Sequence, residues 1–228
     1  MNIFELIRQT PLFRDIDIGT IEELAQHCHQ KNYHKAQHIF GAGDKADFFF
    51  VIMKGWVKLF RVSREGEEAV INVFGPRESF AEAAVFREQR SYPVNGQAAT
   101  DAILIEIPHY FFIQKIKEDG RFALRILASI SSHQHYLVRQ IEQVTTRTAP
   151  QRIGAFLLQF CDDKNIESDV MTIDLPYDKS LISTRLNIKP ETFSRALAKL
   201  EPYGVDYHVG QIKIHDPKRL AEFCDVII

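Results

Sequence analysis

Residues 178–200 read Asp-Lys-Ser-Leu-Ile-Ser-Thr-Arg-Leu-Asn-Ile-Lys-Pro-Glu-Thr-Phe-Ser-Arg-Ala-Leu-Ala-Lys-Leu, and no other stretch of the chain is as informative. The apolar residues recur at helical spacing on both sides of a tight turn at 187–189, which predicts two short amphipathic helices. Pro190 suits the first position of the second helix, where a backbone N–H would have no helical partner. The residues predicted to form the inner faces are Leu181, Ile182, Leu186, Phe193, Leu197 and Leu200.

The outer face of the second helix carries polar side chains at its N-terminal end, as in a helix that reads the major groove of DNA. From 179 to 199 there are five basic residues and one acidic residue, whereas the whole chain has a formal net charge of −2. Positive charge is therefore concentrated in this region. The alternative is an ordinary helical hairpin whose charges are only solvated. The residues predicted to bind DNA are Lys179, Arg185, Lys189, Glu191, Thr192, Ser194, Arg195 and Lys199.

The segment that follows the helix pair strengthens the prediction of DNA binding. Residues 205–208 and 211–214 alternate between apolar and polar side chains around Val209-Gly210, which indicates a β-hairpin. A hairpin in this position corresponds to the wing of a winged helix-turn-helix domain. The combination of helix pair and wing is more specific than either part.

Composition limits the remaining possibilities. With 228 residues, 45% of them hydrophobic, the chain can form two domains with real cores. We expect no leader peptide and no membrane span, and hence a cytoplasmic protein. Cys28, Cys161 and Cys224 are far apart, so we expect reduced thiols, and three cysteines cannot hold an iron–sulfur cluster within one subunit. No combination of paired carboxylates, nucleophile and base, or phosphate loop indicates an enzyme.

The N-terminal half has the pattern of an antiparallel β-roll. A small helix is expected over 18–30, followed from about 31 to 107 by short apolar or alternating runs that are broken by turn residues. Such spacing is typical of an antiparallel barrel or jelly roll, so the fold class is α+β. The lone Trp56 is expected on a strand, in core packing. The predicted strands include Phe48–Met53, Gly55–Val62, Ala69–Phe74 and Ala102–Ile107.

A long helix is predicted next, with apolar residues at alternating steps of four and three. This spacing is that of a coiled-coil seam, whose simplest partner is the same helix of a second subunit. A single helix packed on its own domain is the alternative. Gln134 would fix the register of a two-stranded pair. After a break at 145–150, a further helix is expected to pack under the helix pair through Ile153, Phe156, Leu157 and Phe160. The seam residues are Ala123, Leu127, Ile130, Gln134, Leu137, Ile141 and Val144.

The order of these parts resembles the CRP/FNR superfamily of transcription regulators over nearly the whole chain. In the roll, Gly43-Asp44, Phe49-Phe50-Val51-Ile52 and Gly55-Trp56-Val57-Lys58 are similar to the family's core motif. The resemblance implies a sensory, cyclic-nucleotide-binding-like roll over 1–119, a dimerisation helix over 120–146 and a winged helix-turn-helix over 147–228. It also implies RNA polymerase as a partner.

The reading helix resembles the FNR-type branch, because Glu191, Ser194 and Arg195 match its E-x-x-S-R arrangement. The resemblance implies an inverted repeat of TTGAT-like half-sites. Arg195 would pair with guanine, Glu191 with a cytosine or adenine amino group, and Ser194 on the thymine side. This agrees with the chemistry of the base edges, since Arg donates to O6 and N7 of guanine and carboxylates accept from N4 of cytosine.

Cyclic nucleotides are the obvious effectors to consider in such a roll. Family members that bind cAMP have G-E-L and, about ten residues later, an Arg that neutralises the cyclic phosphate. Here Glu82 is present, but Ala81 replaces the Gly, and Tyr92-Pro93 stands where Arg-Ser is expected. A buried phosphate without that Arg would be unpaired and costly. We therefore predict that the chain does not bind cAMP.

The run from Phe80 to Phe86, with Tyr92-Pro93, is instead similar to the Dnr/Nnr branch, the regulators of denitrification. That resemblance implies a nitric oxide sensor with haem between the roll and the dimerisation helix. Histidine is a common haem ligand, although polar surface roles, or a zinc site near the start of the roll, are alternatives. The predicted effector-pocket residues are Glu82, Phe86, Tyr92, Pro93, Leu124 and Leu127, and the candidate haem ligands are His27, His29, His34, His38, His133 and His135.

Together these observations predict a cytoplasmic, homodimeric, sequence-specific regulator of transcription, an activator, whose small effector biases the hinge near 147–150. A different class of function stays open at this point. The chain could be a signalling subunit that binds a cyclic nucleotide or another small ligand and docks its C-terminal domain onto a protein rather than onto DNA.

Overall fold

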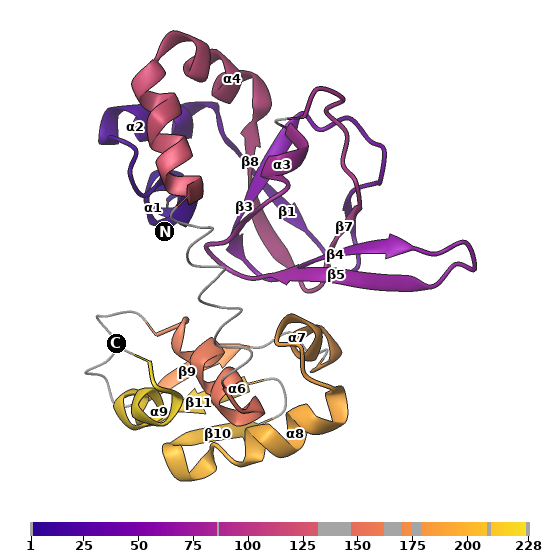
Figure 1. Ribbon diagram of the computed structural model, residues 1–228, viewed down its shortest axis with the longest axis vertical. Coiled ribbons are helices and arrows are strands. Elements are labelled where there is room, and N and C mark those ends of the chain that lie inside the picture. The colour runs from indigo at the N-terminus through magenta and orange to yellow at the C-terminus, as the bar shows by residue number, and fades with distance from the viewer. Residues whose placement is uncertain are drawn as a thin grey trace. The chain divides into compact units, whose positions relative to one another are not determined.

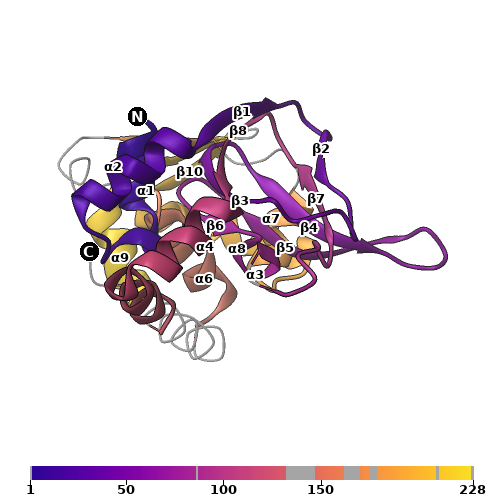
Figure 2. The same ribbon diagram turned by 90° about the horizontal axis from the view of Figure 1, so that it is seen from above.

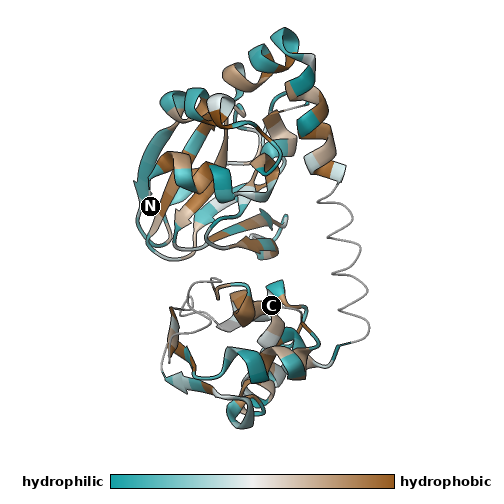
Figure 3. Cartoon of the chain, turned by 90° about the vertical axis from the view of Figure 1, so that its left-hand side faces the viewer, coloured by the Kyte–Doolittle hydropathy of each residue, from teal (hydrophilic) through white to brown (hydrophobic). Residues whose placement is uncertain are grey.

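The computed structural model describes residues 2–85, 87–131, 147–161, 170–174, 179–208 and 211–226. The chain divides into two compact units, Met1–Leu137 and Val138–Ile228 (Figure 1). Hydrophobic and hydrophilic residues are interleaved along the helices of both units (Figure 3). In the described part of the chain, no helix has both the length and the apolar character needed to cross a membrane.

The N-terminal unit contains the predicted antiparallel roll. Its strands form two four-stranded sheets, in the orders β1-β8-β3-β6 and β2-β7-β4-β5, and every neighbouring pair is antiparallel. The β4–β5 hairpin extends away from the rest of the roll in both views (Figures 1 and 2). The strands are β1 His29–Tyr33, β2 His38–Phe40, β3 Phe48–Lys54, β4 Val57–Val62, β5 Glu68–Phe74, β6 Ser79–Phe80, β7 Asn95–Ala98 and β8 Ala102–Pro108.

The prediction placed Trp56 on a strand that starts at Gly55, and this detail is wrong. Gly55 has φ of +86° and Trp56 lies in the turn, so β4 begins at Val57. A side chain at residue 55 would lie 2.7 Å from Ala102 Cα, so the close approach of two backbones requires glycine there. Trp56 is nonetheless buried, with 3% of its surface exposed, and its backbone N–H donates to Thr100 Oγ1 at 3.0 Å.

Aromatic side chains from both sheets fill the interior of the roll. The rings of Phe40 and Tyr92 stack with centroids 3.8 Å apart, and those of Phe50 and Phe80 with centroids 5.0 Å apart. Phe74 joins the cluster against Phe80 at 5.6 Å. The interior is thus packed with protein side chains, and we call these residues the aromatic cluster.

Helices cover the outer side of the sheet that contains β3. Phe112 lies at the centre of this contact, with its ring 5.9 Å from that of Phe13, 5.2 Å from Phe49 and 5.3 Å from Phe122. These four rings join the N-terminal helices, the sheet and the helix at 120–131. The helical elements are α1 Ile3–Gln9, η1 Pro11–Phe13, α2 Ile18–His27, α3 Glu82–Val85, α4 His109–Glu118 and residues 120–131.

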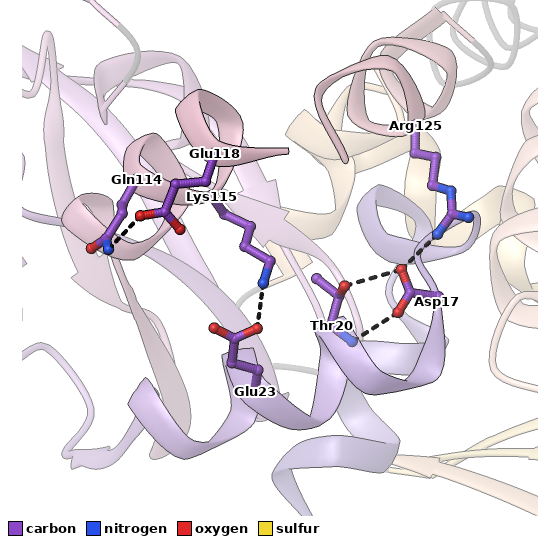
Figure 4. A network of polar contacts seen from close by, with 7 residues as sticks. All are labelled: Asp17, Thr20, Glu23, Gln114, Lys115, Glu118 and Arg125. Atoms are coloured by element: carbon purple, nitrogen blue, oxygen red, sulfur yellow. Dashed lines mark hydrogen bonds and ion pairs between the residues drawn. The ribbon is translucent and has the colours of Figure 1, made fainter. Parts of the chain in front are cut away.

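Polar contacts tie the helix at 120–131 to the N-terminal helices (Figure 4). Asp17 is the N-cap of α2: its carboxylate accepts from the Thr20 N–H at 2.9 Å and from Arg125 Nη1 at 2.6 Å. Ser129 Oγ donates to the Pro11 carbonyl at 2.9 Å. These contacts therefore hold the helix at 120–131 against the N-terminal helices.

Replacing Asp17 by alanine is expected to lower the free energy of unfolding by about 1 kcal/mol at neutral pH, because α2 loses its cap. The N–H of Thr20, foremost, holds the pKa of the Asp17 carboxyl below its ordinary value. This stabilisation is present above the ordinary carboxyl pKa and is lost as the pH falls through the lowered value. Urea denaturation at about pH 7 and about pH 3 should show the difference from wild type shrink in acid. The exposed Asp15→Ala is the control, and an equal difference at both pH values would contradict the assignment.

The C-terminal unit is a winged helix-turn-helix, as predicted. A three-stranded antiparallel sheet, in the order β10-β11-β9, stands beside the helices. The sequence did not predict β9 or α9. The elements are α6 Ala149–Leu158, β9 Met171–Asp174, α7 Lys179–Arg185, α8 Pro190–Ala198, η2 Glu201–Tyr203, β10 Val205–His208, β11 Gln211–Ile214 and α9 Pro217–Cys224.

The helix α6 is the central element of this unit. Ile153, Phe156 and Leu157 are buried as expected, whereas Phe160 is half-buried and follows the end of the helix. At Gly154 a side chain would clash with the Cys224 sulfur, so α6 and α9 pack closely. The middle of α6 is thereby packed directly against α9.

Candidate DNA-reading and effector sites

The helix α8 has two distinct faces. Phe193, Ala196 and Leu197 are buried. The residues predicted to read bases, Glu191, Ser194 and Arg195, are exposed on the other side. Of the other residues predicted to bind DNA, Thr192, Lys189 and Lys199 are exposed, Arg185 is half-buried, and Lys179 begins α7 with its side chain outside the described residues.

The turn before α8 has a defined hydrogen-bonding pattern. Asn187 has φ of +51°, and the Ile188 N–H donates to the Ser183 carbonyl at 2.8 Å while the Asn187 N–H donates to Thr184 at 3.1 Å. These two bonds form a Schellman motif, in which asparagine takes the left-handed position that glycine usually fills. The motif ends α7 sharply and sets the start of α8.

The N-terminus of α8 has the features expected from the sequence. Pro190 is its first residue, and the preceding Lys189 makes no side-chain capping bond. Pro190 has no N–H, and the N–H groups of Thr192 and Phe193 both donate to the Lys189 carbonyl, at 2.9 and 3.0 Å. The exposed Glu191 lies at this end of α8, the end predicted to enter the major groove.

Arg185 is engaged within the unit. Its guanidinium carbon lies 5.3 Å from the centre of the Phe156 ring, a cation–π arrangement on α6. Contact between Arg185 and DNA stays a prediction, and such a contact would compete with the packing of Arg185 against Phe156.

The two strands of the wing hairpin pair with each other, as the alternation of apolar and polar residues predicted. Val205 faces Ile214 and His208 faces Gln211 across β10 and β11, and the tip at 209–210 lies outside the described residues. At the base of the hairpin, His215 Nε2 and Asp206 Oδ2 are 2.9 Å apart. Strand β9 pairs with β11 and extends the wing into a sheet.

In the predicted effector region, Tyr92 is part of the aromatic cluster. Its hydroxyl donates to the Phe48 carbonyl at 2.6 Å. Burial raises the pKa of Tyr92 to about 12, so the hydroxyl stays protonated and can donate this bond. Ala81 has φ of +68°, the left-handed conformation expected of the glycine that it replaces in the family motif. Glu82 is the first residue of α3, and Phe86 lies outside the described residues.

Among the described residues, those predicted to bind the effector are not gathered around one enclosed cavity. An open pocket of about 320 Å³ lies beside them, and Pro93 is the predicted residue that lines it. Leu124 and Leu127 are 67% and 61% exposed on the helix at 120–131. The other residues that line the pocket are Arg87, Glu88, Gln89 and Ser91.

The histidines proposed as haem ligands are dispersed. The ring of His27 packs against Phe111 at 4.8 Å, and His38 lies against Phe60 at 6.1 Å. His29 and His34 are exposed, and His133 and His135 lie outside the described residues. No histidine is among the described residues that line the pocket, and the described residues include no group of three or more His, Cys, Asp or Glu, such as a zinc site would need. Haem needs one or two axial ligands rather than such a group, so haem binding stays a prediction.

The cysteines are free thiols in different parts of the chain. Cys28 and Cys224 are buried and Cys161 is half-buried. Burial raises the pKa of Cys28 to about 12 and that of Cys224 to about 11. The buried thiols are thus protonated and poor metal ligands at neutral pH.

In the described part of the predicted dimer seam, Leu127 and Ile130 are exposed and Ala123 is half-buried. Leu127 and Ile130 are 61% and 38% exposed, whereas Phe122 and Ile126 on another face of the same helix are buried in the N-terminal unit. Packing on its own unit therefore does not cover the seam. Gln134, Leu137, Ile141 and Val144 lie outside the described residues.

Comparison with known proteins decides the family. Residues 30–119 match the model of the cyclic nucleotide-binding domain, and residues 151–223 match the Crp-like helix-turn-helix domain. A solved structure from Ruegeria pomeroyi, of a protein named for cyclic nucleotide binding, is 34% identical, covers 99% of this chain and 98% of its own, and has a TM-score of 0.87.

The chain belongs to the CRP/FNR family of transcription regulators.

As a CRP/FNR regulator, it combines an effector-binding domain with a DNA-binding domain and is not an enzyme. The global nitrogen regulator of Synechococcus elongatus is 28% identical to it, over 92% of this chain and 94% of that protein. The structure of DNR from Pseudomonas aeruginosa is 27% identical, covers 96% of each chain and has a TM-score of 0.59. These relatives share the architecture with this CRP/FNR regulator and differ in name, so they do not identify its effector.

Proposed function

We propose that this CRP/FNR regulator binds an inverted repeat of TTGAT-like half-sites as a homodimer, in the cytoplasm, and activates transcription through RNA polymerase. The observation that carries the proposal is the placement of Glu191, Ser194 and Arg195 together on the exposed face of α8, behind a sharply defined turn. Arg195 can donate to O6 and N7 of guanine, and Glu191 can accept from a cytosine or adenine amino group.

The homodimer is supported by the exposed seam. Apolar residues at a and d spacing, such as Leu127 and Ile130, are exposed in the single chain and are suited to the same helix of a second copy. A two-fold dimer would place two copies of α8 in successive major grooves, one helical turn apart. The inverted repeat of the operator follows from that symmetry.

The effector would act by binding the DNA-competent arrangement more tightly than the incompetent one. A cyclic nucleotide is disfavoured, because Tyr92 stands at the position of the phosphate-binding arginine and its ring is buried against Phe40. The resemblance to the Dnr/Nnr branch makes haem with nitric oxide the candidate to test, and its ligand would be sought at His133 or His135.

The proposal is tested by fluorescence anisotropy of a labelled duplex that contains two TTGAT half-sites in inverted orientation. The anaerobic protein is titrated at fixed salt, as purified, with haem, with haem and nitric oxide, and with cAMP, because phosphate contacts make the affinity salt-dependent. Tight binding only when haem and nitric oxide are both present would support the Dnr-like sensor. Tight binding in every state would support the reader and exclude haem control, and no binding in any state would contradict this operator.

Replacing Arg195 by alanine should weaken operator binding by about 1–3 kcal/mol and relax the preference at the guanine position. The reason is the loss of the two hydrogen bonds that the guanidinium can make to one base. Competition with duplexes that carry each base at that position measures both effects. Lys218→Ala, an exposed change on α9, is the matched control. Unchanged affinity in Arg195→Ala would favour the alternative function, a ligand-binding subunit that docks a protein.

A further inference from the structure

Arg152, on α6, is outside every set of residues that the sequence singled out for DNA binding, yet it contacts the turn of the helix pair. Its Nη1 atom donates to two consecutive backbone carbonyls, those of Leu186 at 3.1 Å and Asn187 at 3.2 Å. Both residues belong to the Schellman turn between α7 and α8. One side chain of α6 therefore holds the turn that sets the start of the reading helix.

The chemistry of this contact is specific to the end of a helix. Leu186 and Asn187 directly follow the end of α7, where carbonyl groups have no N–H partner within the helix and where partial negative charge favours a cation. The Schellman bonds use the N–H groups of Asn187 and Ile188, and they leave the carbonyls of Leu186 and Asn187 for the guanidinium. Arg152 thus completes the hydrogen bonding of the turn from outside the helix pair.

The helix that carries Arg152 is itself held against α9. Next to Arg152, Gln151 Nε2 donates to the carbonyl of Phe223 on α9 at 3.1 Å. Gly154, half a turn further along α6, allows the close packing against Cys224. Because α6 is held to α9 at both points, the hydrogen bonds from Arg152 place the turn at a defined position relative to α6.

Arg152 is not placed there for stability alone. Its Nε atom is buried and has no hydrogen-bond partner among the residues that the structure describes. A buried donor without a partner lowers stability. Because the buried Nε atom lowers stability, the position of Arg152 is better explained by a role in orienting the turn than by a contribution to stability.

We propose that Arg152 is a positioning residue for DNA reading: it fixes the Leu186–Asn187 turn to α6 and so sets the orientation at which α8 presents its base-reading side chains. This inference rests on the proposed function. The base contacts of Arg195 and Glu191 depend on orientation, whereas contacts with phosphates tolerate more movement. Loss of Arg152 should therefore reduce discrimination between sequences more than it reduces general attraction to DNA.

The experiment measures the affinity of the full-length dimer for the TTGAT duplex and for a scrambled duplex of equal length, over a series of salt concentrations. Arg152→Met removes the donors and keeps the length of the side chain, and Arg152→Lys restores a cationic donor. Arg219→Met makes the same chemical change at an exposed position on α9 and serves as the control. Urea denaturation of each variant shows that it is folded under the conditions of the titration.

We expect Arg152→Met to lose about tenfold in the ratio of operator to scrambled affinity, which corresponds to about one base contact. Its salt slope should stay that of wild type, Arg152→Lys should recover part of the ratio, and Arg219→Met should keep all of it. A wild-type ratio in folded Arg152→Met, or a loss of salt slope that marks a direct phosphate contact, would overturn the inference. If wild type itself does not prefer the operator, the proposed function fails instead. Should Arg152→Met not fold, the ratio measured for Arg152→Lys decides alone, and a wild-type value would overturn the inference.

Discussion

Phe80→Ala is expected to lower the free energy of unfolding of the N-terminal unit by about 3–5 kcal/mol, the usual range for a fully buried phenylalanine. Phe80 is 1% exposed, and its ring stacks against Phe50 at 5.0 Å and Phe74 at 5.6 Å. Since these rings come from both sheets, their neighbours cannot collapse into the space without moving a strand. The change therefore adds a cavity to the loss of buried apolar surface.

Urea denaturation of Phe80→Ala and wild type provides the measurement. Tyr110→Ala is the control, because Tyr110 is 59% exposed and its loss should cost less than about 1 kcal/mol. A loss in Phe80→Ala no larger than in this control would show that the roll is not held together by its aromatic cluster.

Leu127→Glu is expected to convert the protein to a monomer and to weaken operator binding by about 100-fold or more, because the second half-site then no longer binds as part of one molecule. Leu127 lies on the exposed part of the seam and, in a dimer of this helix, would meet its own copy. Two carboxylates would then be buried face to face without a cation, an arrangement that is strongly unfavourable.

Sedimentation and anisotropy with the same samples measure the two effects of Leu127→Glu together. Ala128→Glu places the same charge one residue further on, at an exposed position outside the a and d spacing, and should leave both quantities near their wild-type values. A dimer that survives Leu127→Glu would show that another surface joins the subunits.

The fold was predictable where the side-chain pattern was regular. The strands β3, β4, β5 and β8 followed from short apolar or alternating runs between turn residues, and most residues of β3 and β8 are buried. The helix pair and the wing followed from their periodicity. β1 was missed since four of its five residues are exposed, and β6, with two residues, is too short to show a period. The start of β4 was misplaced because the close approach of Gly55 to Ala102 depends on residues distant in sequence.

The reading face of α8 was predictable for the same reason: its buried residues identify its exposed ones. Arg152 was not, because a contact between α6 and a turn more than thirty residues later has no local signal. The arginine could have been noticed only as a charge within the apolar run of α6. Likewise, the burial of Tyr92 against Phe40 joins two parts of the roll that the sequence does not show to be adjacent.

The position of Trp56 has a practical consequence. It is the one tryptophan of the sequence, and it is buried in the N-terminal unit. The C-terminal unit has a hydrophobic core of its own, so melting of this chain need not be a single cooperative event. Tryptophan emission is therefore an intrinsic spectroscopic label for one half of the molecule, and far-ultraviolet circular dichroism records both. The native chain thus carries its own means of assigning each transition to a unit.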